Sequence, residues 1–522
     1  MKANERIMSA TLTIQPRERD FSRPGALAWL RPSLLDALLV SLLVWLIGYT
    51  ASGGPAGLLQ DAGTGVHIRT GSLILHRHAV PRWDVFSFTH DGQPWFAWEW
   101  LSDVIFSWLW QWAGLKGIVL LSAILITAAF GIVVRQMIRR GASALTALFL
   151  VHVGIAVSSV HFLARPHLFT LFLIALSLYL IELDRATPSR RILLLIPLAA
   201  LWANLHGGFM ALPVSLLSFA AGDAIAFLFG RTEALARAKR YALLAVGCLV
   251  ASGLNPYGFA EHVHLIRYMN AEWIRRLVLE FQPPQFEGVP GLYAELLVLA
   301  SGVLVFRLLA RAEFGSALLV GFWLNAAMHS VRHLPVLAIV ALPLAAPEVQ
   351  QAWNWCVARA RRGSALAVLD SIGNDHSRGL ARLSIWPALA IAAIAFTSML
   401  PFPVDFPEPR YPVSLVTKNA DLLAISQVFS TDAVGDYLIY RLSPRVRVFV
   451  DGRSDMYGQK LIDEYLTVLN GGRGWDTILA RSGTNAALVP ANCALASLLR
   501  GRAGWVTLED GPNFAFFRRK IL

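Results

Sequence analysis

The sequence predicts a polytopic α-helical membrane protein with about eleven spans and a C-terminal α/β domain outside the membrane. Three observations support this fold class. Hydrophobic residues make up 56% of the 522 residues, and the mean hydropathy is +0.53. Charged residues make up only 15%, against roughly 25% in an average soluble domain. Arg-rich segments occur in every second connection between apolar runs, as the positive-inside rule requires of a multi-pass protein.

The first apolar run follows a basic tail, residues 1–32, and is too long for the hydrophobic region of a typical signal peptide. We interpret it as an uncleaved signal anchor. Further apolar segments follow within a transmembrane domain of residues 33–400, and some are short against the roughly 20 residues that a bilayer needs. The predicted spans are 33–51, 116–134, 143–162, 167–184, 192–205, 209–230, 241–254, 291–309, 314–331, 334–347 and 383–400.

The basic segments predict how the chain is oriented. "RQMIRRG", "DRATPSRR", "RTEALARAKR", "RLLARAE" and "ARARRG" all fall on the same side as the tail. This pattern predicts a multi-pass protein of the cytoplasmic (inner) membrane, with the N-terminal tail in the cytoplasm and the C-terminal domain outside. The formal net charge of +12 reports this topology, so no nucleic-acid partner is expected.

A large outer loop, residues 52–115, follows the first span. The segment Trp98 to Gly114 in this loop is rich in Trp but also carries Glu99 and Asp103. Counting it as a span would reverse every later loop and place "RQMIRR" outside, so we predict a helix lying in the membrane interface. A second short helix is expected to begin near Thr64, and the Trp-rich helix near Phe96.

The character of the chain changes at the Pro-rich linker "PFPVDFPEPRYP". Beyond it, short β-like runs ("QVFS", "RVRVFV", "NAALVP", "WVTLED" and "NFAFF") alternate with helical stretches. Residues 401–522 are therefore predicted to form a compact α/β domain on the outer side.

Short polar motifs stand at the outer ends of the predicted spans. Ionisable groups there are costly unless they face a cavity or a partner, so they indicate a functional site. Interfacial anchoring is the alternative, but several loops converge on one face. The candidate residues are Asp61, Arg165, His167, Asn204, His206, Asn255, Tyr257, Glu280, Arg332 and His333.

The combination of basic groups with a carboxylate at the membrane surface suits an anionic lipid head group. Guanidinium groups bind phosphate through paired hydrogen bonds, and a carboxylate can accept a proton. The residues therefore favour Arg165 and Arg332 as phosphate ligands, with His206 and Tyr257 as further hydrogen-bond donors.

The order of these motifs resembles the GT-C superfamily of polyprenyl-phosphate-sugar-dependent membrane glycosyltransferases, which includes protein O-mannosyltransferases and lipid A aminoarabinose transferases. The resemblance covers roughly residues 33–400 and rests on "TGVHIRTGSLIL", "VPRWD", "WFAWEWLSDVIFSWLW" and "RQMIRRG". With "ARPHLF", "WANLHGGF", "LNPYG" and "DGRSDMYG", the chain is most similar to a bacterial subgroup of unknown substrate.

The resemblance implies that the acid leading the first outer loop, Asp61, is the catalytic base. Family members often carry a paired acid at this place, whereas this chain has Ala62 and Gly63. That difference argues against a metal held by paired acids, and no recurring H-x-x-x-H pair predicts a zinc site. No metal or other cofactor is expected, and a divalent metal is the open alternative.

A further motif, "DGRSDMYG", lies in the C-terminal domain. Asp451, Arg453 and Asp455 could bind an acceptor hydroxyl or a cation there, or the two acids could simply cap the chain and pair with the arginine. Both interpretations remain open on the sequence.

The resemblance implies a glycosyltransferase that moves a sugar from a polyprenyl-phosphate donor to a glycan, lipid or protein acceptor, in surface glycan or lipid modification. Two alternatives remain. A transporter of lipid-linked saccharides would need ionisable residues near mid-membrane and internal repeats, and neither is evident. A non-catalytic subunit of a surface-polysaccharide assembly or export system would use the outer domain to bind partners. The sugar, the acceptor and the oligomeric state are not predicted.

Overall fold

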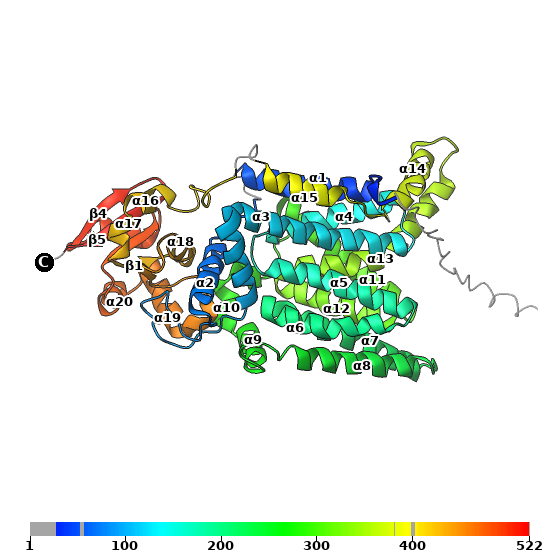
Figure 1. Cartoon of the computed structure of the whole chain (residues 1–522), viewed down its shortest axis with the longest axis horizontal. Coiled ribbons are helices and arrows are strands. Elements are labelled where there is room, and N and C mark those ends of the chain that lie inside the picture. Colours follow the sequence, from blue (N-terminus) through cyan, green and yellow to red (C-terminus); the bar gives the residue numbers. More distant parts are fainter. Residues whose placement is uncertain (1–27, 53–56, 381, 398–401, 521–522) are drawn as a thin grey trace, which may run out of the picture.

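The structure is a computed structural model that describes residues 28–52, 57–380, 382–397 and 402–520. The predicted cytoplasmic tail lies outside the described residues, apart from residues 28–32. The described chain forms a long bundle of helices with a sheet domain beside one end (Figure 1). We call this end, which carries α2 (Gly63–Arg77), the proximal end, and the opposite end, which carries α14 (Ala365–Leu380), the distal end.

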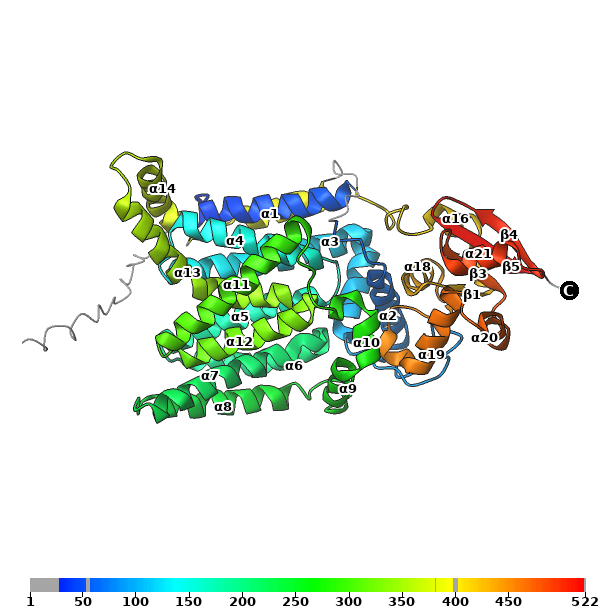
Figure 2. The same ribbon diagram turned by 180° about the vertical axis from the view of Figure 1, so that it is seen from behind.

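Helices occupy all the predicted spans, and they run side by side along the bundle in both views (Figures 1 and 2). They are α1 (Leu34–Ala51), α3 (Trp100–Arg139), α4 (Ala144–Ser158), α5 (His167–Ala186), α6 (Leu195–Leu205), α7 (Ala211–Leu228), α8 (Ala234–Ala251), α11 (Gly288–Ala310), α12 (Phe314–His329), α13 (Leu334–Arg359) and α15 (Trp386–Phe396).

Within the described residues, 7 helical stretches are long and apolar enough to cross a membrane by length and composition. They contain α1, α3, α4, α5, α7, α11 and α13. The other predicted spans, α6, α8, α12 and α15, are helices in the same bundle that are shorter or carry more charge. The predicted number of about eleven spans therefore agrees with the number of helices in the bundle. Seven of these helices are long and apolar enough to cross a membrane by themselves.

The Trp-rich segment of the outer loop forms the first part of α3. Hydrogen bonding continues through Gly114, but the backbone there has φ 61° and ψ −153°, so the helix turns sharply at that residue. A positive φ of this kind is accessible to glycine without strain. The first part of α3 and α2 both lie across the end of the bundle (Figure 1), the geometry expected of interfacial helices. The Trp-rich helix begins at Trp100, four residues later than expected.

Close backbone approach joins these two helices. A Cβ atom at Gly71 of α2 would lie 1.9 Å from the backbone oxygen of Asp103 in α3. Because only glycine lacks this atom, the "RTGSL" sequence lets α2 pack directly on the α3 backbone. This contact fixes the position of α2 relative to α3, and with it the positions of the outer-loop side chains that these helices carry.

The connection between α8 and α11 carries α9 (Ala260–Asn270) and α10 (Glu272–Leu277), which lie at the proximal end beside α2 (Figure 2). The sheet domain follows α15. Its helices are α16 (Val413–Lys418), α17 (Ala420–Ala424), α18 (Asp432–Leu442), α19 (Ser454–Leu469), α20 (Trp475–Arg481) and α21 (Ala494–Arg500).

The sheet has five strands in the order β2-β1-β3-β5-β4. They are β1 (Gln427–Ser430), β2 (Arg447–Val448), β3 (Ala486–Pro490), β4 (Trp505–Asp510) and β5 (Phe514–Arg519). β1 pairs in parallel with β2 and β3, whereas β5 is antiparallel to β3 and β4. The predicted α/β character is confirmed, although only two residues of "RVRVFV" pair as a strand.

The outer loop extends the edge of this sheet. Val448 of β2 donates its N–H to the carbonyl of Phe86 at 3.0 Å, and Phe88 donates to the carbonyl of Val448 at 3.0 Å. The apolar core also runs without a break from the bundle helices into α18 and β1. The sheet domain is therefore packed onto the proximal end rather than attached by the linker alone.

Candidate functional site

A cavity of about 380 Å³ lies at the proximal end, between the bundle and the sheet domain. Its walls come from α2, the chain before α3, the connections at the ends of α4, α6 and α12, the α9 region, and the sheet domain. The predicted site residues that line it are Arg165, His167, His206, Glu280, Arg332, His333, Arg453 and Asp455. Residues from widely separated loops therefore meet in one place.

Asp61, which was expected to line this cavity, is not among its lining residues; it lies beside the cavity and contacts Arg165 of the wall. Arg165 Nη1 donates to Asp61 Oδ2 at 2.9 Å, and the backbone N–H of Gly63 donates to Asp61 Oδ1 at 2.7 Å. Arg165 Nη1 also lies 3.6 Å from Glu280 Oε1. The charge of Asp61 raises the pKa of Arg165 above its ordinary value, while burial opposes this effect. Both oxygens of Asp61 are thus engaged, and Arg165 stands between two carboxylates.

Glu280 keeps its charge in this arrangement. Burial raises its pKa, but the neighbouring Arg165 and Arg332 lower it further, so the net shift is downward. Arg332 itself stacks over the Phe281 ring at 4.5 Å. Among the described residues, no carboxylate oxygen lies within 4.0 Å of its guanidinium nitrogens. Arg332 is therefore a cation of the cavity wall that a bound anion could pair with.

Glu99, which precedes α3, is a site residue that the sequence interpretation missed. Its Oε1 lies 3.4 Å from His206 Nε2 and its Oε2 lies 3.6 Å from His67 Nε2. Burial raises the pKa of Glu99 to about 7, partly offset by His67. The only signal in the sequence was an acid within the apolar run "WFAWEWLSD".

The two histidines beside Glu99 have defined hydrogen bonds on their other nitrogens. Gly208 N–H donates to His206 Nδ1 at 2.9 Å, so the proton of the neutral ring sits on Nε2, facing Glu99. His67 Nδ1 lies 2.7 Å from Asp103 Oδ1. Burial lowers the pKa of His67 to about 4, and burial together with Arg332 and His167 holds the pKa of His206 well below its usual range. Both rings are therefore neutral at pH 7.

His167 and His333 complete the wall opposite α2. His167 Nε2 lies 2.8 Å from the carbonyl oxygen of His161, and the two imidazole rings are 4.2 Å apart. His333 Nδ1 contacts the carbonyl of Ala326 at 3.2 Å. Each ring therefore has one nitrogen held by backbone, which fixes its orientation toward the cavity.

Asn204, Asn255 and Tyr257 are not among the residues that line the cavity, so the expectation that Tyr257 would do so is wrong. Asn204 accepts from Trp100 Nε1 at 2.7 Å and donates to the carbonyl of Leu254 at 2.8 Å. Tyr257 Oη donates to the carbonyl of Pro81 at 2.9 Å and accepts from Ala97 N–H.

Asn255 has the same kind of role as these two residues. Its Nδ2 donates to the carbonyls of Ser252 and Gly258, and its Oδ1 accepts from the N–H of Tyr257 at 2.8 Å. The "LNPYG" motif therefore forms a turn that holds the outer loop in place.

The "DGRSDMYG" motif joins the sheet domain to the outer loop. Arg453 Nη2 donates to Asp84 Oδ1 at 2.8 Å and to Asp451 Oδ2 at 2.6 Å, and its guanidinium lies 4.3 Å from the Trp95 ring centre. Asp455 Oδ2 lies 2.9 Å from His264 Nε2. Asp451 is 1% exposed and serves to hold Arg453, whereas Arg453 and Asp455 face the cavity.

No group of three or more His, Cys, Asp or Glu side chains within the described residues has an arrangement suited to a metal ion. What the cavity offers is a set of cations, neutral imidazoles and carboxylates around a space of ligand size. Such a set can bind a phosphate and move a proton.

No family model and no curated protein matches the chain in sequence. Among solved structures, the fold is similar to that of the oligosaccharyltransferase AglB from Archaeoglobus fulgidus in complex with an inhibitory peptide and a dolichol-phosphate. The TM-score is 0.53 at 12% identity, over 92% of this chain and 73% of that one. For the form of the Archaeoglobus fulgidus enzyme tethered to an acceptor peptide, the TM-score is 0.52 at 12% identity, over 88% of this chain and 68% of that one.

At this level of identity the likeness concerns the fold. It extends over the bundle and the sheet domain together, because about nine-tenths of this chain is covered. The predicted fold, a membrane helix bundle with a C-terminal α/β domain, is therefore confirmed, and it is similar to the fold of AglB.

Proposed function

We propose that the protein is a glycosyltransferase that moves a sugar from a polyprenyl-phosphate donor to an acceptor on the outer face of the cytoplasmic membrane. The observation that carries this proposal is the unpaired cation Arg332 facing Arg165, Glu99 and Glu280 in one cavity at the end of the bundle. The similar fold of AglB, in a complex that holds dolichol-phosphate, supports a lipid-linked donor.

The orientation proposed here is the one the sequence predicts. In Figure 1 the chain between α7 and α8 and helix α14 lie at the distal end, and the sheet domain lies at the other. Residues of the sheet domain line the cavity, which is therefore at the proximal end. The Arg-rich connections therefore gather at one end of the bundle, which favours a cytoplasmic distal end. The donor lipid would reach the cavity from the outer leaflet.

In the proposed reaction the acceptor hydroxyl oxygen attacks the anomeric carbon of the donor sugar. The bond from that carbon to the phosphate oxygen breaks, and polyprenyl phosphate leaves as an anion. The hydroxyl proton passes to a carboxylate of the enzyme. Arg332 binds the phosphate, and its positive charge stabilises the charge that the phosphate gains, as oxyanion donors do.

We assign the proton to Asp61, which the resemblance implies as the base. In the free enzyme Arg165 occupies Asp61 Oδ2. A donor phosphate competes for this guanidinium, and its arrival frees the carboxylate oxygen in the same step. Glu99 is the second candidate because it lines the cavity and has a pKa raised by burial to about 7, near the pH at which a general base works best.

The experiment compares cells that lack the protein with cells that carry the wild-type chain or Asp61→Asn. Mass spectrometry of surface glycans and lipids should show the loss of one sugar mass in cells that lack the protein and in cells that carry Asp61→Asn. An unchanged glycan profile without the protein would refute the proposal. Full modification by Asp61→Asn at normal protein level would remove Asp61 from the reaction, and full modification by both Asp61→Asn and Glu99→Gln would favour the assembly-subunit alternative, because such a subunit needs no base. Loss of lipid-linked precursor transport across the membrane would favour the transporter.

A further inference from the structure

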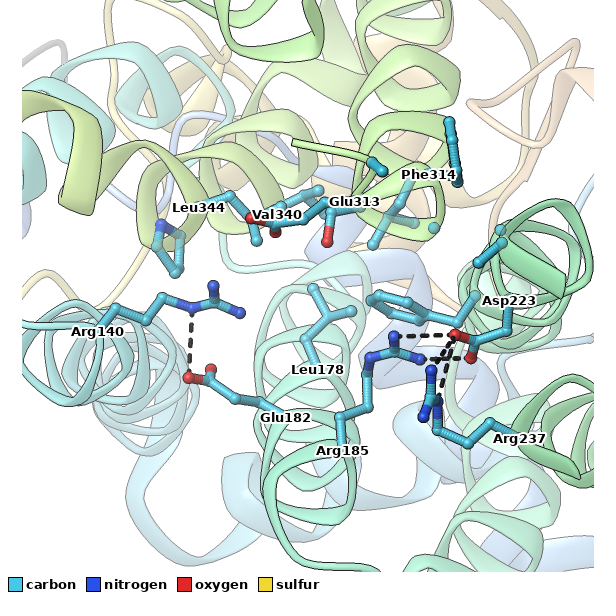
Figure 3. Close-up of a pocket in the computed structure, with 18 of the residues that line it drawn as sticks. Arg140, Leu178, Glu182, Arg185, Asp223, Arg237, Glu313, Phe314, Val340 and Leu344 are labelled. Carbon is cyan, nitrogen blue, oxygen red and sulfur yellow. Dashed lines mark hydrogen bonds and ion pairs between the residues drawn. The ribbon is translucent and has the colours of Figure 1, made fainter. Parts of the chain in front are cut away.

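A second pocket lies at the distal end, remote from the cavity described above. Its volume is about 280 Å³, and it is enclosed by the ends of α3, α5 and α7, the start of α12 and the middle of α13 (Figure 3). Ligand pockets usually measure roughly 300–1,000 Å³. The space therefore suits a small polar group rather than a whole lipid or a nucleotide.

Two ion-pair clusters face each other across this pocket (Figure 3). On one side Arg140 Nε lies 3.2 Å from Glu182 Oε1. On the other side Arg185 and Arg237 share the single carboxylate of Asp223, at 2.8 Å and 3.3 Å. The second cluster therefore carries one uncompensated positive charge.

Arg231 adds a further cation. Its side chain donates a hydrogen bond of 3.4 Å to the carbonyl of Ala312, and no carboxylate of the described residues lies within 4.0 Å of it. Glu313 is the remaining acid of the lining. Four guanidinium groups thus stand against three carboxylates, so the pocket attracts an anion.

The same pocket contains acceptors that lack a donor. Gln136 Oε1 and Glu182 Oε2 are buried, and neither receives a hydrogen bond within the described parts of the chain. In α13, Pro343 has no N–H to donate to the carbonyl of Ile339, and both residues line the pocket. Arg140 Nε is a buried donor that also lacks a hydrogen bond within the described residues. Unpaired buried groups cost free energy, so a ligand that brings both acceptor oxygens and N–H or O–H donors is favoured here.

The rim of the pocket is apolar and exposed. Phe314 of the lining stacks on Phe229 with ring centres 5.5 Å apart, and Phe229 is 75% exposed. Leu228 beside it is 80% exposed. Aromatic and apolar side chains at the end of a membrane bundle contact acyl chains and head groups. A ligand can therefore place its polar part inside and its hydrocarbon outside.

We propose that the distal pocket binds the head group of a glycerophospholipid, with the phosphate on Arg231 and Arg237 and head-group donors on Gln136 and Glu182. Ethanolamine and glycerol head groups supply both parts, because each carries a phosphodiester and N–H or O–H donors. A choline head group supplies the phosphate but no donor. The pocket thus binds phospholipids with ethanolamine or glycerol head groups in preference to those with choline, although all of them carry the same phosphate.

The test is native mass spectrometry of the purified full chain with phosphatidylethanolamine, phosphatidylglycerol and phosphatidylcholine of identical acyl chains. The first two lipids should remain bound several-fold more than phosphatidylcholine. Arg231→Gln should weaken their binding about fivefold, the effect of one basic group near a phospholipid surface. Arg231 forms no ion pair within 4.0 Å, so this variant should fold normally. Arg361→Gln, an exposed arginine of the α13 to α14 connection that does not line the pocket, is the matched control.

A second variant separates the donors from the charge. Gln136→Leu removes an unpaired buried acceptor, which does not destabilise the fold by the loss of a hydrogen bond. It should lower the binding of phosphatidylethanolamine and phosphatidylglycerol toward that of phosphatidylcholine. Equal binding of all three lipids by the wild-type chain would overturn the proposal. Binding of soluble glycerol 3-phosphate by a chain that retains none of the three lipids would overturn it too. Asp61→Asn should leave lipid binding here unchanged, so this proposal and the proposed glycosyltransferase activity fail separately.

Discussion

Arg165 donates a hydrogen bond from Nη1 to Oδ2 of Asp61 across 2.9 Å, although 104 residues separate them in the sequence. The pair closes one side of the proximal cavity and leaves Arg332 as the cation without a carboxylate partner within 4.0 Å among the described residues. The two arginines, predicted to act alike, therefore have different environments. Substitutions at the two positions should give different results.

Replacing Asp61 with Asn removes a proton acceptor but keeps the shape of the side chain. We expect turnover of the polyprenyl-phosphate sugar to fall by about 10²- to 10⁴-fold, the usual contribution of a general base. Binding of polyprenyl phosphate should survive, because Arg165 loses a competitor for the phosphate. Release of polyprenyl phosphate from the donor and native mass spectrometry measure the two effects. Glu99→Gln, assayed in parallel, identifies which carboxylate takes the proton.

Replacing Arg332 with Ala should weaken both donor binding and turnover, since the phosphate loses its unpaired cation. The loss in transition-state stabilisation should be about 3 kcal/mol. Thermal stability should fall less than in a variant that breaks a close ion pair, because the substitution removes only the contact with Phe281 and the longer-range attraction to Glu280. Arg267→Ala, an exposed arginine of α9, is the control for a lost charge at the same end. Normal donor affinity in Arg332→Ala would remove this residue from the phosphate site.

Glu99 should make stability depend on pH. Its pKa is raised from 4.5 to about 7, so between these values the folded chain binds more protons than the unfolded chain. Stability from this group is therefore present below pH 4.5 and is lost as the pH rises through 7, by about 3 kcal/mol in all.

The comparison of the wild-type chain with Glu99→Gln between pH 5 and 8 isolates this effect. His67 has a pKa lowered to about 4 and acts in the opposite sense, losing stability as the pH falls from 6.5. Glu99 is one of the groups that raise the pKa of His67, so the substitution also changes the His67 contribution below pH 6.5. Above pH 6.5 His67 is largely neutral in both the folded and the unfolded chain, and the difference between the two proteins there reports Glu99. The melting temperature of the variant should exceed that of the wild type increasingly toward pH 8, and parallel pH profiles would contradict the raised pKa.

Arg453 should be essential for the attachment of the sheet domain. Arg453→Ala leaves Asp84 and Asp451 buried without their cation, which typically costs about 3–5 kcal/mol. Arg447→Ala also breaks a pair between the sheet domain and the outer loop, with Asp91, but both partners are about half exposed. That loss should be at most about 1 kcal/mol. Thermal unfolding and protease sensitivity of the linker after α15 measure the difference.

Gly71→Ala should prevent α2 from packing on α3. The added Cβ would lie 1.9 Å from a backbone oxygen, and backbone cannot move aside without separating the helices. Gly48→Ala in α1 is the matched control, since nothing lies within 4 Å of the position of its Cβ. We expect a lower melting temperature and lost activity for the first variant, and a slight gain in stability for the second.

The bundle and the strands could be predicted because they depend on local patterns. Apolar runs alternating with Arg-rich loops located the helices, and β1 and β4 begin and end at the predicted residues. An interfacial helix ending near Gly114 was also predicted, because it alone kept the basic loops on one side, and the structure has its kink at that residue. What the pattern could not supply was the length of each helix, since the predicted span 192–205 is divided between a 3-10 turn, Arg190–Leu194, and the 11 residues of α6.

The site was predicted only in part, for a physical reason. A polar residue at the end of a span can face a cavity or can hold a loop, and the two uses look alike in sequence. Asn204, Asn255 and Tyr257 hold backbone groups, whereas Arg165 and Arg332 face the cavity. Glu99 was missed because its partner His206 lies more than a hundred residues away, and the packing of α3 against α6 brings them together.

The contact between Arg453 and Asp84 also sets the order of events during synthesis, because 369 residues separate the two partners. At about 5–20 residues per second, a ribosome needs roughly 20 to 70 seconds to pass from one to the other. The outer loop is synthesised early, and nearly every helix of the bundle is inserted before the sheet domain, the last wall of the proximal cavity, is synthesised. The newborn chain therefore has no closed proximal cavity until assembly of the bundle is almost finished.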